Sequence, residues 1–524
     1  MPDASTLTAP TGSRFLHGEP TTTFTPEDFD ADERLMVDTA EEFCRAEVLP
    51  HLDEIDHQEE GLMPRLIAQA GELGLCGVDS PESYGGLGLG KNLAARILEF
   101  MSLNGSFSVT YGITSGISQV GLSLFGTEAQ KAEFLPSLAE GREIGAYALS
   151  EPNSGSDALS ASTRAVRDGD EWVLDGTKMW ISNAKWAGQF LTIAKVDGER
   201  LSAFIVPRDA PGVSISREEH KMGLKGSSTA RLVLDGARIP VGNLLHEEGK
   251  GHQVALNALN IGRFKLASMS IGPCRDAIAL GAAYARERKQ FGTPISQFGL
   301  IQEKLAHAAA KFFAIESAIY RTGADIDAAF AAHGGTVAGN LTAAQEFAVE
   351  CSAIKVMATE IESEIVDEML QIYGGYGFTE EYPIARHYRD ARVSRIYEGT
   401  NEINRIFLAA RYLQRIGTDL PSGDEPVARA VRRAAEEGGK LDQIRLGALS
   451  DLIMCAYVAQ SSRLRAGRLG GAAKELDGLA QVWLAARERG AEARFFGTAE
   501  GVATAANARD VADLVHDARG PLRF

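Results

Sequence analysis

The sequence predicts a mainly α-helical protein with a small inserted β domain: an α-helical bundle, an antiparallel β domain, a four-helix bundle and an appended C-terminal helical domain. Two patterns carry this prediction. Apolar residues recur every three or four positions in the first and last parts of the chain, which is the period of a helix that buries one face. Between these parts, short β-favouring runs are separated by Asp-Gly pairs, which are typical of hairpin turns. With 524 residues, 44% of them hydrophobic, the chain can form several domains.

The first three segments follow in order. Residues 1–25 are polar and rich in Pro and Thr, which predicts a flexible N-terminal segment. Residues 26–145 carry the helical period, for example in "DERLMVDTAEEFCRAEVLPHLDEID", and form the expected N-terminal α-helical domain. Residues 146–258 form the expected middle β domain, with runs such as "FLTIAKVDG" and "ARLVLDGARIP". Its turns are expected at the Asp-Gly pairs that begin at residues 168, 175, 197 and 235.

Long helical runs return near Gly251. Those over 259–415 have the lengths of bundle helices and predict a C-terminal four-helix bundle domain that closes against the first helical domain. "GTDLPSGDEP" predicts a linker over 416–426, and the Ala/Arg/Leu-rich residues 427–524 predict the appended α-helical domain. This tail is weakly amphipathic and balanced in charge, so helices packed on the bundle are favoured over association with a membrane surface.

Composition excludes several classes of function. A net charge of -18 argues against nucleic acid as a partner, because phosphate binding needs a basic face. The start of the chain lacks the apolar core of a signal peptide and no later run is long and apolar enough for a membrane span, so the expected compartment is the cytoplasm. Five scattered cysteines predict reduced thiols, and ten histidines without HExxH-like spacing predict no metal site.

Three separated stretches are candidates for chemistry, and each has a plain structural alternative. "AYALSEPNSGSDA" (146–158) is either an ordinary loop or a set of N–H and hydroxyl groups that line a planar ligand. In "GTKMWISNA", Trp180 is either a core residue or a wall of a binding site. In "QIYGGYGF", Gly374 and Gly375 either cap a long helix or leave room for a dinucleotide backbone.

"RIYEGTNEI" (395–403) poses the sharpest question. Glu398 is either an exposed charge at the start of a helix, favoured by the helix dipole, or a working carboxylate. A carboxylate that serves as a general base needs a dry site, because burial raises its pKa to ~6–7. Gly399 next to it allows a close ligand, so that the Glu398 N–H could stabilise a developing oxyanion.

The blocks "LSEPNSGSD", "WISN", "KMGLKGSSTARLVLDGARIP", "RKQFG", "QIYGGYGFTEEYP" and "IYEGTNEI" together resemble the acyl-CoA dehydrogenase family, flavoenzymes built as helix bundle, β domain and helix bundle. The likeness covers roughly residues 26 to 415. It implies FAD as cofactor, an acyl-CoA substrate and Glu398 as catalytic base. The FAD-binding residues it implies are Tyr147, Leu149, Ser150, Ser156, Trp180, Ser182, Arg288, Phe291, Gln371, Gly374, Gly375, Thr400 and Glu402. The substrate-binding residues it implies are Ser156, Asn260, Arg263, Glu398 and Gly399.

The resemblance also bears on assembly and on the position of the base. Arg288, Phe291, Gln371 and Gly375 match positions that in the family reach the FAD of a neighbouring subunit, so a homodimer is implied. Some branches carry the base immediately before the arginine that corresponds to Arg263. Gly262 stands there in this chain, which leaves Glu398 as the candidate.

The branch it most resembles is the very-long-chain one, because "LNIGRF", "FGLIQEKLA" and the C-terminal helical extension look alike. The expected reaction is α,β-dehydrogenation of a saturated, long-chain acyl-CoA to the trans-2-enoyl-CoA, with electrons passed to electron-transfer flavoprotein. The alternatives are an acyl-CoA oxidase or flavin monooxygenase on the same scaffold, and a non-enzymatic assembly or scaffold protein. Gly116, Ser118 and Gly121 either deepen an acyl pocket or allow close helix packing.

Overall fold

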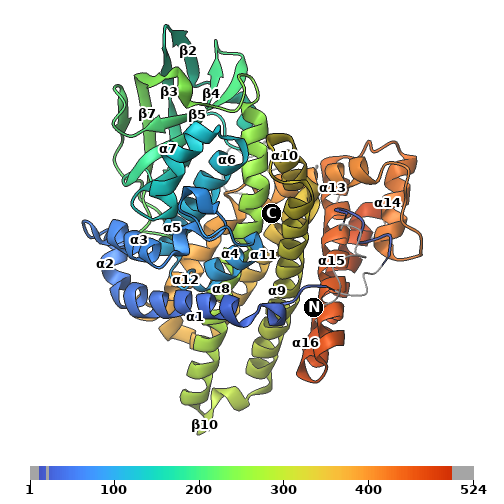
Figure 1. Cartoon of the computed structure of the whole chain (residues 1–524). Helices are drawn as coiled ribbons and strands as arrows, with labels where there is room; N and C mark the ends of the chain where they lie inside the picture. Colours follow the sequence, from blue (N-terminus) through green and yellow to red (C-terminus); the bar gives the residue numbers. More distant parts are fainter. Residues whose placement is uncertain (1–10, 19–22, 498–524) are drawn as a thin grey trace, which may run out of the picture.

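The computed structural model describes residues 11–18 and 23–497 and shows a helical N-terminal part, a β sheet and a long helical bundle (Figure 1). The N-terminal helices begin at polar caps: Asp30 and Thr127 each accept a hydrogen bond from the first turn of the helix that follows. The α-helices of this part are α1 (Ala31–Phe43), α2 (Leu52–Asp56), α3 (Leu62–Glu72), α4 (Lys91–Phe100), α5 (Gly105–Gly112), α6 (Ser118–Phe125) and α7 (Glu128–Ala139).

The sheet stands at one end of the molecule (Figure 1). Its strands are β1 (Ile144–Ala148), β2 (Arg164–Asp168), β3 (Glu171–Ser182), β4 (Ala187–Val196), β5 (Arg200–Pro207), β6 (Val213–Ile215), β7 (Thr229–Pro240) and β8 (Leu244–Leu245). The strand order is β6-β7-β3-β2-β4-β5-β8, and β1 pairs with β4.

The sequence predicted an antiparallel β domain, but the sheet also contains two parallel pairs of strands. Both β1 and β2 run parallel to β4. The reason is connectivity: β1 leaves through a long loop, and the connection from β3 to β4 crosses β2, so neither parallel pair is joined by a hairpin.

Two of the four Asp-Gly pairs that were predicted to form turns lie inside strands instead. The pairs at Asp168 and Asp197 do turn the chain, between β2 and β3 and between β4 and β5. The pairs at Asp175 and Asp235 lie inside β3 and β7, where the ladder shifts register and the Gly236 N–H donates to Asp175 Oδ1 over 2.8 Å. Asp-Gly marks a local irregularity in both cases, but a bulge can absorb it within a long strand.

The second helical part forms the centre of the molecule. It contains α8 (Gly251–Glu287), the small hairpin β9 (Lys289–Gln290) and β10 (Thr293–Pro294), α9 (Gly299–His333), α10 (Val337–Glu346), α11 (Ala348–Tyr373), α12 (Pro383–Ala391) and α13 (Asn401–Ile416). Because α8 already begins at residue 251, the predicted domain boundary at 258/259 falls inside a helix. The helix itself begins where the sequence predicts helical runs to return, near Gly251.

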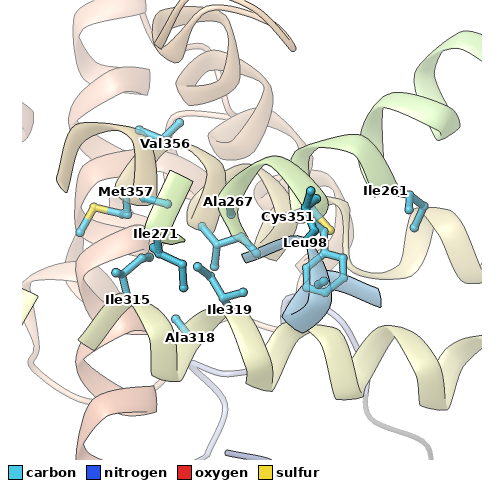
Figure 2. Close-up of a cluster of buried hydrophobic side chains, with 14 of the residues drawn as sticks. Leu98, Ile261, Ala267, Ile271, Ile315, Ala318, Ile319, Cys351, Val356 and Met357 are labelled. Atoms are coloured by element: carbon cyan, nitrogen blue, oxygen red, sulfur yellow. The ribbon is translucent and has the colours of Figure 1, made fainter. Parts of the chain in front are cut away.

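The core joins the two helical parts. Figure 2 shows Ile271 of α8 close to Ile315 and Ile319 of α9, with Leu98 of α4 nearby. All of these side chains are buried. The first helical part is therefore closed against the bundle, and the space between α5–α6, the sheet and α8 remains for a binding site.

The appended helices lie along one side of the bundle (Figure 1). They are α14 (Pro426–Glu436), α15 (Gln443–Leu469) and α16 (Ala472–Phe496), and the predicted domain beyond residue 497 lies outside the described residues. Buried ion pairs join them to the body: Arg465 to Glu316 over 2.7 Å, and Arg405 to Asp451 over 2.8 Å. No described helix is long and apolar enough to cross a membrane.

The described part of the N-terminal segment is packed, whereas the sequence predicted a flexible segment over 1–25. The Phe15 ring is buried, with its centroid 4.8 Å from that of Tyr457. Gln460 donates from Nε2 to the Phe15 carbonyl over 3.1 Å. A single phenylalanine within a polar stretch is a weak sequence signal, and its partners lie more than 400 residues away.

Candidate active site

A cavity of about 290 Å³ opens where the sheet meets the α5–α6 junction, α8 and the loop before α13. Apolar residues form most of its wall, and Glu398 is the one acidic residue among those that line it. The sequence-predicted residues found in its lining are Tyr147, Leu149, Ser150, Ser156, Trp180, Ser182, Arg263, Glu398 and Gly399. Segments that are far apart in the sequence thus meet in one cavity.

Glu398 lies on a strained loop that is held from several sides. It has φ +56°, a left-handed conformation that is uncommon for a residue with a side chain, and Gly399 follows with φ +79°. Asn404 Nδ2 donates to the Gly399 carbonyl over 2.7 Å, and Lys355 Nζ donates to the same oxygen over 2.9 Å. The loop therefore presents its carboxylate in one fixed place.

The surroundings of Glu398 disfavour the charged form of its carboxyl group. Burial raises the pKa of Glu398 to about 7, although the charges of Arg263 and Lys355 act in the opposite direction. Its Oε2 atom accepts no hydrogen bond from any described residue. Burial also lowers the pKa of Lys355 to about 7, and burial together with Glu398 raises the pKa of Tyr147. A carboxylate with these properties can take a proton near neutral pH.

Gly262 faces Glu398 across the cavity wall. A Cβ atom added at Gly262 would lie 3.0 Å from Glu398 Oε2. A side chain at either position thus reaches the same space. A carboxylate carried by either position would therefore lie in the same part of the cavity.

Trp180 is not a core residue. It sits with φ +61° at a shift of register between β3 and β7, and 56% of its surface is exposed. The bulge turns the indole out of the sheet and toward the cavity. Trp180 is thus a wall of the cavity.

The loop that carries Ser150 and Ser156 is anchored by a buried ion pair. Lys178 Nζ donates to Glu151 Oε1 over 2.7 Å, and the Ser162 and Thr163 N–H groups donate to the same carboxylate over 2.6 and 3.0 Å. Burial opposes the charge of Glu151, but Lys178 and these donors hold its pKa at about 2. The stretch 150–156 is therefore more than an ordinary loop, because its backbone is fixed beside the cavity.

A second group of predicted residues lies elsewhere. Arg288, Gly374 and Gly375 line a separate surface pocket of about 530 Å³, which shares no lining residue with the main cavity. Gly374 also caps α11 with φ +60°, which is the first of its two predicted roles; room for a dinucleotide backbone stays a prediction. Phe291 is 96% exposed at the nearby β hairpin, and Gln371 is exposed on α11.

The remaining predicted residues support the loop or face solvent. Asn260 is buried and accepts a hydrogen bond from Arg263 Nη1 over 3.1 Å. Thr400 caps α13 by accepting from the Ile403 N–H over 3.2 Å. Glu402 is exposed in the first turn of α13.

Gly116, Ser118 and Gly121 divide between the two predicted roles, which are deepening of the acyl pocket and close packing of helices. Gly116 lines the cavity, within a π-helical turn (Ile113–Ile117) that it distorts with φ -121° and ψ -107°. Gly121 instead packs on the sheet, because an added Cβ would lie 2.5 Å from Leu191 Cδ2. Ser118 is buried against Gly145 of β1. Of these three residues, only Gly116 therefore lines the cavity.

Sequence reasoning missed several residues that build the site, namely Glu151, Lys178, Lys355 and Asn404. Lys355 had a signal, since a lysine in "SAIKVMA" is surrounded by apolar residues and must find buried acceptors. Glu151 and Lys178 lie within the quoted motifs, but nothing in the sequence pairs them.

The fold and the cavity together define a class of enzyme: helix bundle, β domain and helix bundle around a cavity that Glu398 lines as its one acidic residue within the described chain. Family models for the N-terminal, middle and C-terminal domains of acyl-CoA dehydrogenases match residues 30–142, 146–237 and 249–413. The chain belongs to the acyl-CoA dehydrogenase family.

Individual relatives agree with this assignment. A probable acyl-CoA dehydrogenase of Bacillus subtilis is 49% identical over 423 residues, which cover 79% of this chain and 70% of the relative. The human mitochondrial very long-chain specific acyl-CoA dehydrogenase is 38% identical over 67% of this chain and 53% of its own length. The crystal structure of an acyl-CoA dehydrogenase complexed with FAD from Bacillus anthracis matches with a TM-score of 0.88 and 42% identity, over 92% of this chain and 91% of that one.

Proposed function

We propose that this enzyme uses FAD to oxidise a saturated, long-chain acyl-CoA to the trans-2-enoyl-CoA and passes the electrons to electron-transfer flavoprotein. One observation carries the proposal: the Oε2 atom of Glu398 is buried and has no hydrogen-bond partner among the described residues, in a cavity with a mostly apolar wall. Removal of the α proton of a thioester needs such a base.

The residues present fit FAD. Trp180 offers an exposed indole face, and Ser150, Ser156 and Ser182 offer hydroxyl groups along the same cavity. The proposed holding set in this subunit adds Tyr147 and Leu149. FAD, when bound, supplies the acceptor for the β hydride.

The chain itself supplies the base and its orientation. The Glu398 carboxylate takes the α proton, and Lys355 and Asn404 keep its loop in place. The Glu398 N–H donates to no acceptor among the described residues and is free to meet the thioester oxygen. A donor of this kind contributes ~10²–10³ in rate.

The proposed preference for a long chain rests on the apolar wall of the cavity. Leu98, Gly112, Gly116 and Met269 belong to this wall. A Cβ added at Gly112 would already touch Leu98 and Met269, at 3.4 and 3.5 Å.

The test is anaerobic addition of acyl-CoA thioesters from C4 to C20 to the yellow protein. We expect bleaching with palmitoyl-CoA; a colourless protein, or no bleaching by any thioester, would refute the proposal, and peroxide formation would indicate an oxidase.

The pH dependence has a defined sign. Because Glu398 acts as a base, kcat/KM should rise as pH increases through about 7, the pKa that burial gives it. At pH 6 about a tenth of the carboxyl is ionised, so about a tenth of the rate should remain. Stability has the opposite sign: a raised carboxyl pKa stabilises the fold below the ordinary carboxyl pKa, and this contribution is lost as pH rises through about 7. A flat kcat/KM profile between pH 5.5 and 8 would contradict the role of Glu398.

A homodimer is the smallest active unit that we propose. Arg288, Gly374 and Gly375 line a surface pocket apart from the cavity that contains Glu398, which supports contact with the FAD of another subunit. Phe291 and Phe378 are 96% and 87% exposed beside that pocket, and exposed aromatic residues of this kind mark contact surfaces.

Mixed dimers test whether Arg288 acts across the interface. Two differently tagged chains, one with Glu398→Gln and one with Arg288→Ala, are co-expressed and the heterodimer is purified. Each parent homodimer should be inactive. The heterodimer combines one intact Glu398 with one intact Arg288 and should recover about half of the wild-type rate per dimer, as expected for one of two symmetric sites. If Arg288 instead served its own subunit, the heterodimer would be as inactive as its parents.

A further inference from the structure

A second, much smaller cavity lies directly behind the residue that precedes Glu398. Its volume is about 20 Å³, which suffices for one water molecule (~10–15 Å³). Tyr397 and Met269 line both this cavity and the main one. The polar residues that line the small cavity are Ser108, Ser270, Glu362, His387, Asp390, Ser394 and Tyr397.

The polar groups of this cavity are incompletely satisfied. Glu362 of α11 is 5% exposed, and its Oε2 atom has no hydrogen-bond partner among the described residues. The same holds for Ser270 Oγ of α8. A buried polar atom without a partner costs about 1–3 kcal/mol, so a bridging water is the expected occupant.

Polar groups continue from the small cavity toward solvent. His387 of α12 lines it and places Nε2 3.0 Å from Asp276 Oδ2 of α8. The Asp276 side chain is 18% exposed. These polar groups thus share one small cavity behind Tyr397, and His387 connects that cavity with the partly exposed Asp276.

Burial raises the pKa of both acids that line the small cavity toward the neutral range. Burial raises the pKa of Glu362 to about 8 and that of Asp390 to about 6, on either side of the value of about 7 for Glu398. Burial raises the pKa of Tyr397 far above its ordinary range, and Glu362, Glu398 and Asp390 add to this shift. The phenol of Tyr397 therefore stays protonated. It passes a proton on by accepting one at its oxygen while it donates its own. Other charged groups act on Asp390, namely Asp56, His387 and Arg389.

We propose that Tyr397, Glu362, Asp390 and His387 form a proton path that connects Glu398 with solvent near Asp276. The inference rests on the proposed role of Glu398 and states where its proton goes. One proton arrives on Glu398 from the substrate, each member of the path accepts one and releases one, and one reaches solvent. The path lets this proton leave Glu398 while an acyl chain fills the main cavity.

A thioester with sulfur in place of the β carbon separates the two steps, because it can lose an α proton but no hydride. With the holoenzyme in D₂O, absorbance reports formation of the enolate, and NMR reports deuterium at the α carbon. In Tyr397→Phe and in Glu362→Gln we expect unchanged enolate formation and exchange slowed at least about tenfold. Glu362→Gln keeps the side-chain shape and removes a buried ionisable group, so this variant is expected to fold.

Glu350→Gln is the matched control, since Glu350 is also buried and burial raises its pKa to about 7, but it lines neither cavity. It should exchange like wild type. Wild-type exchange in both Tyr397→Phe and Glu362→Gln would overturn the path and leave the proposed function intact. A wild-type holoenzyme that forms no enolate would overturn both.

Discussion

Replacement of Glu398 by Gln is expected to slow reduction of the flavin by acyl-CoA about 10²–10⁴-fold, with FAD still bound. The amide keeps the shape of the carboxylate but cannot take a proton. No other acidic residue lines the main cavity of the described chain, so nothing nearby replaces the base. The measurement is anaerobic stopped-flow absorbance with palmitoyl-CoA, together with the FAD content of the purified variant.

Glu350→Gln controls for the loss of any buried carboxyl with a raised pKa. It should reduce flavin at the wild-type rate, because Glu350 does not line the cavity. Rapid flavin reduction by Glu398→Gln would show that the mechanism is wrong even though the family assignment stands. Loss of FAD from this variant would show that Glu398 has a structural role as well.

The order of helices and strands could be predicted because it follows from local periodicity. The hairpins at Asp168 and Asp197 were also accessible, since Asp-Gly suits the turn between twisted strands. The same dipeptide at Asp175 and Asp235 lies inside long strands. Local sequence indicates that the chain deviates there, but the pairing of β3 with β7 decides whether it turns back.

The site could be predicted only in part, for a similar reason. Motifs pointed to Glu398, Trp180 and Arg263, which the structure brings into one cavity. The groups that fix the Glu398 loop were invisible because they are long-range: Lys355 reaches Gly399 from another helix. The distorted turn around Gly116 and the separation of the Arg288 pocket are likewise consequences of packing.

Moving the base to the opposite wall is expected to restore part of the activity lost without Glu398. In Glu398→Gly the base is gone, and the glycine also relieves the left-handed φ of +56°, a conformation that costs other residues roughly 1–2 kcal/mol. This variant should therefore be inactive but at least as stable as wild type. A Cβ at Gly262 points to within 3.0 Å of the former Oε2 position. Glu398→Gly with Gly262→Glu should thus reduce flavin at least about tenfold faster than Glu398→Gly alone, a gain of ~1.4 kcal/mol in barrier.

The single substitution Gly262→Glu gives the complementary result. Two carboxylates then share one dry space, which strongly raises the pKa of one of them and crowds the substrate. We expect this variant to be slower than wild type and its rate to rise with pH over a higher range. If the double variant folds, binds FAD and still reduces flavin no faster than Glu398→Gly, then a carboxylate in that space is insufficient. The orientation imposed by the strained loop at Glu398 would then be part of the catalytic requirement, together with the Glu398 N–H.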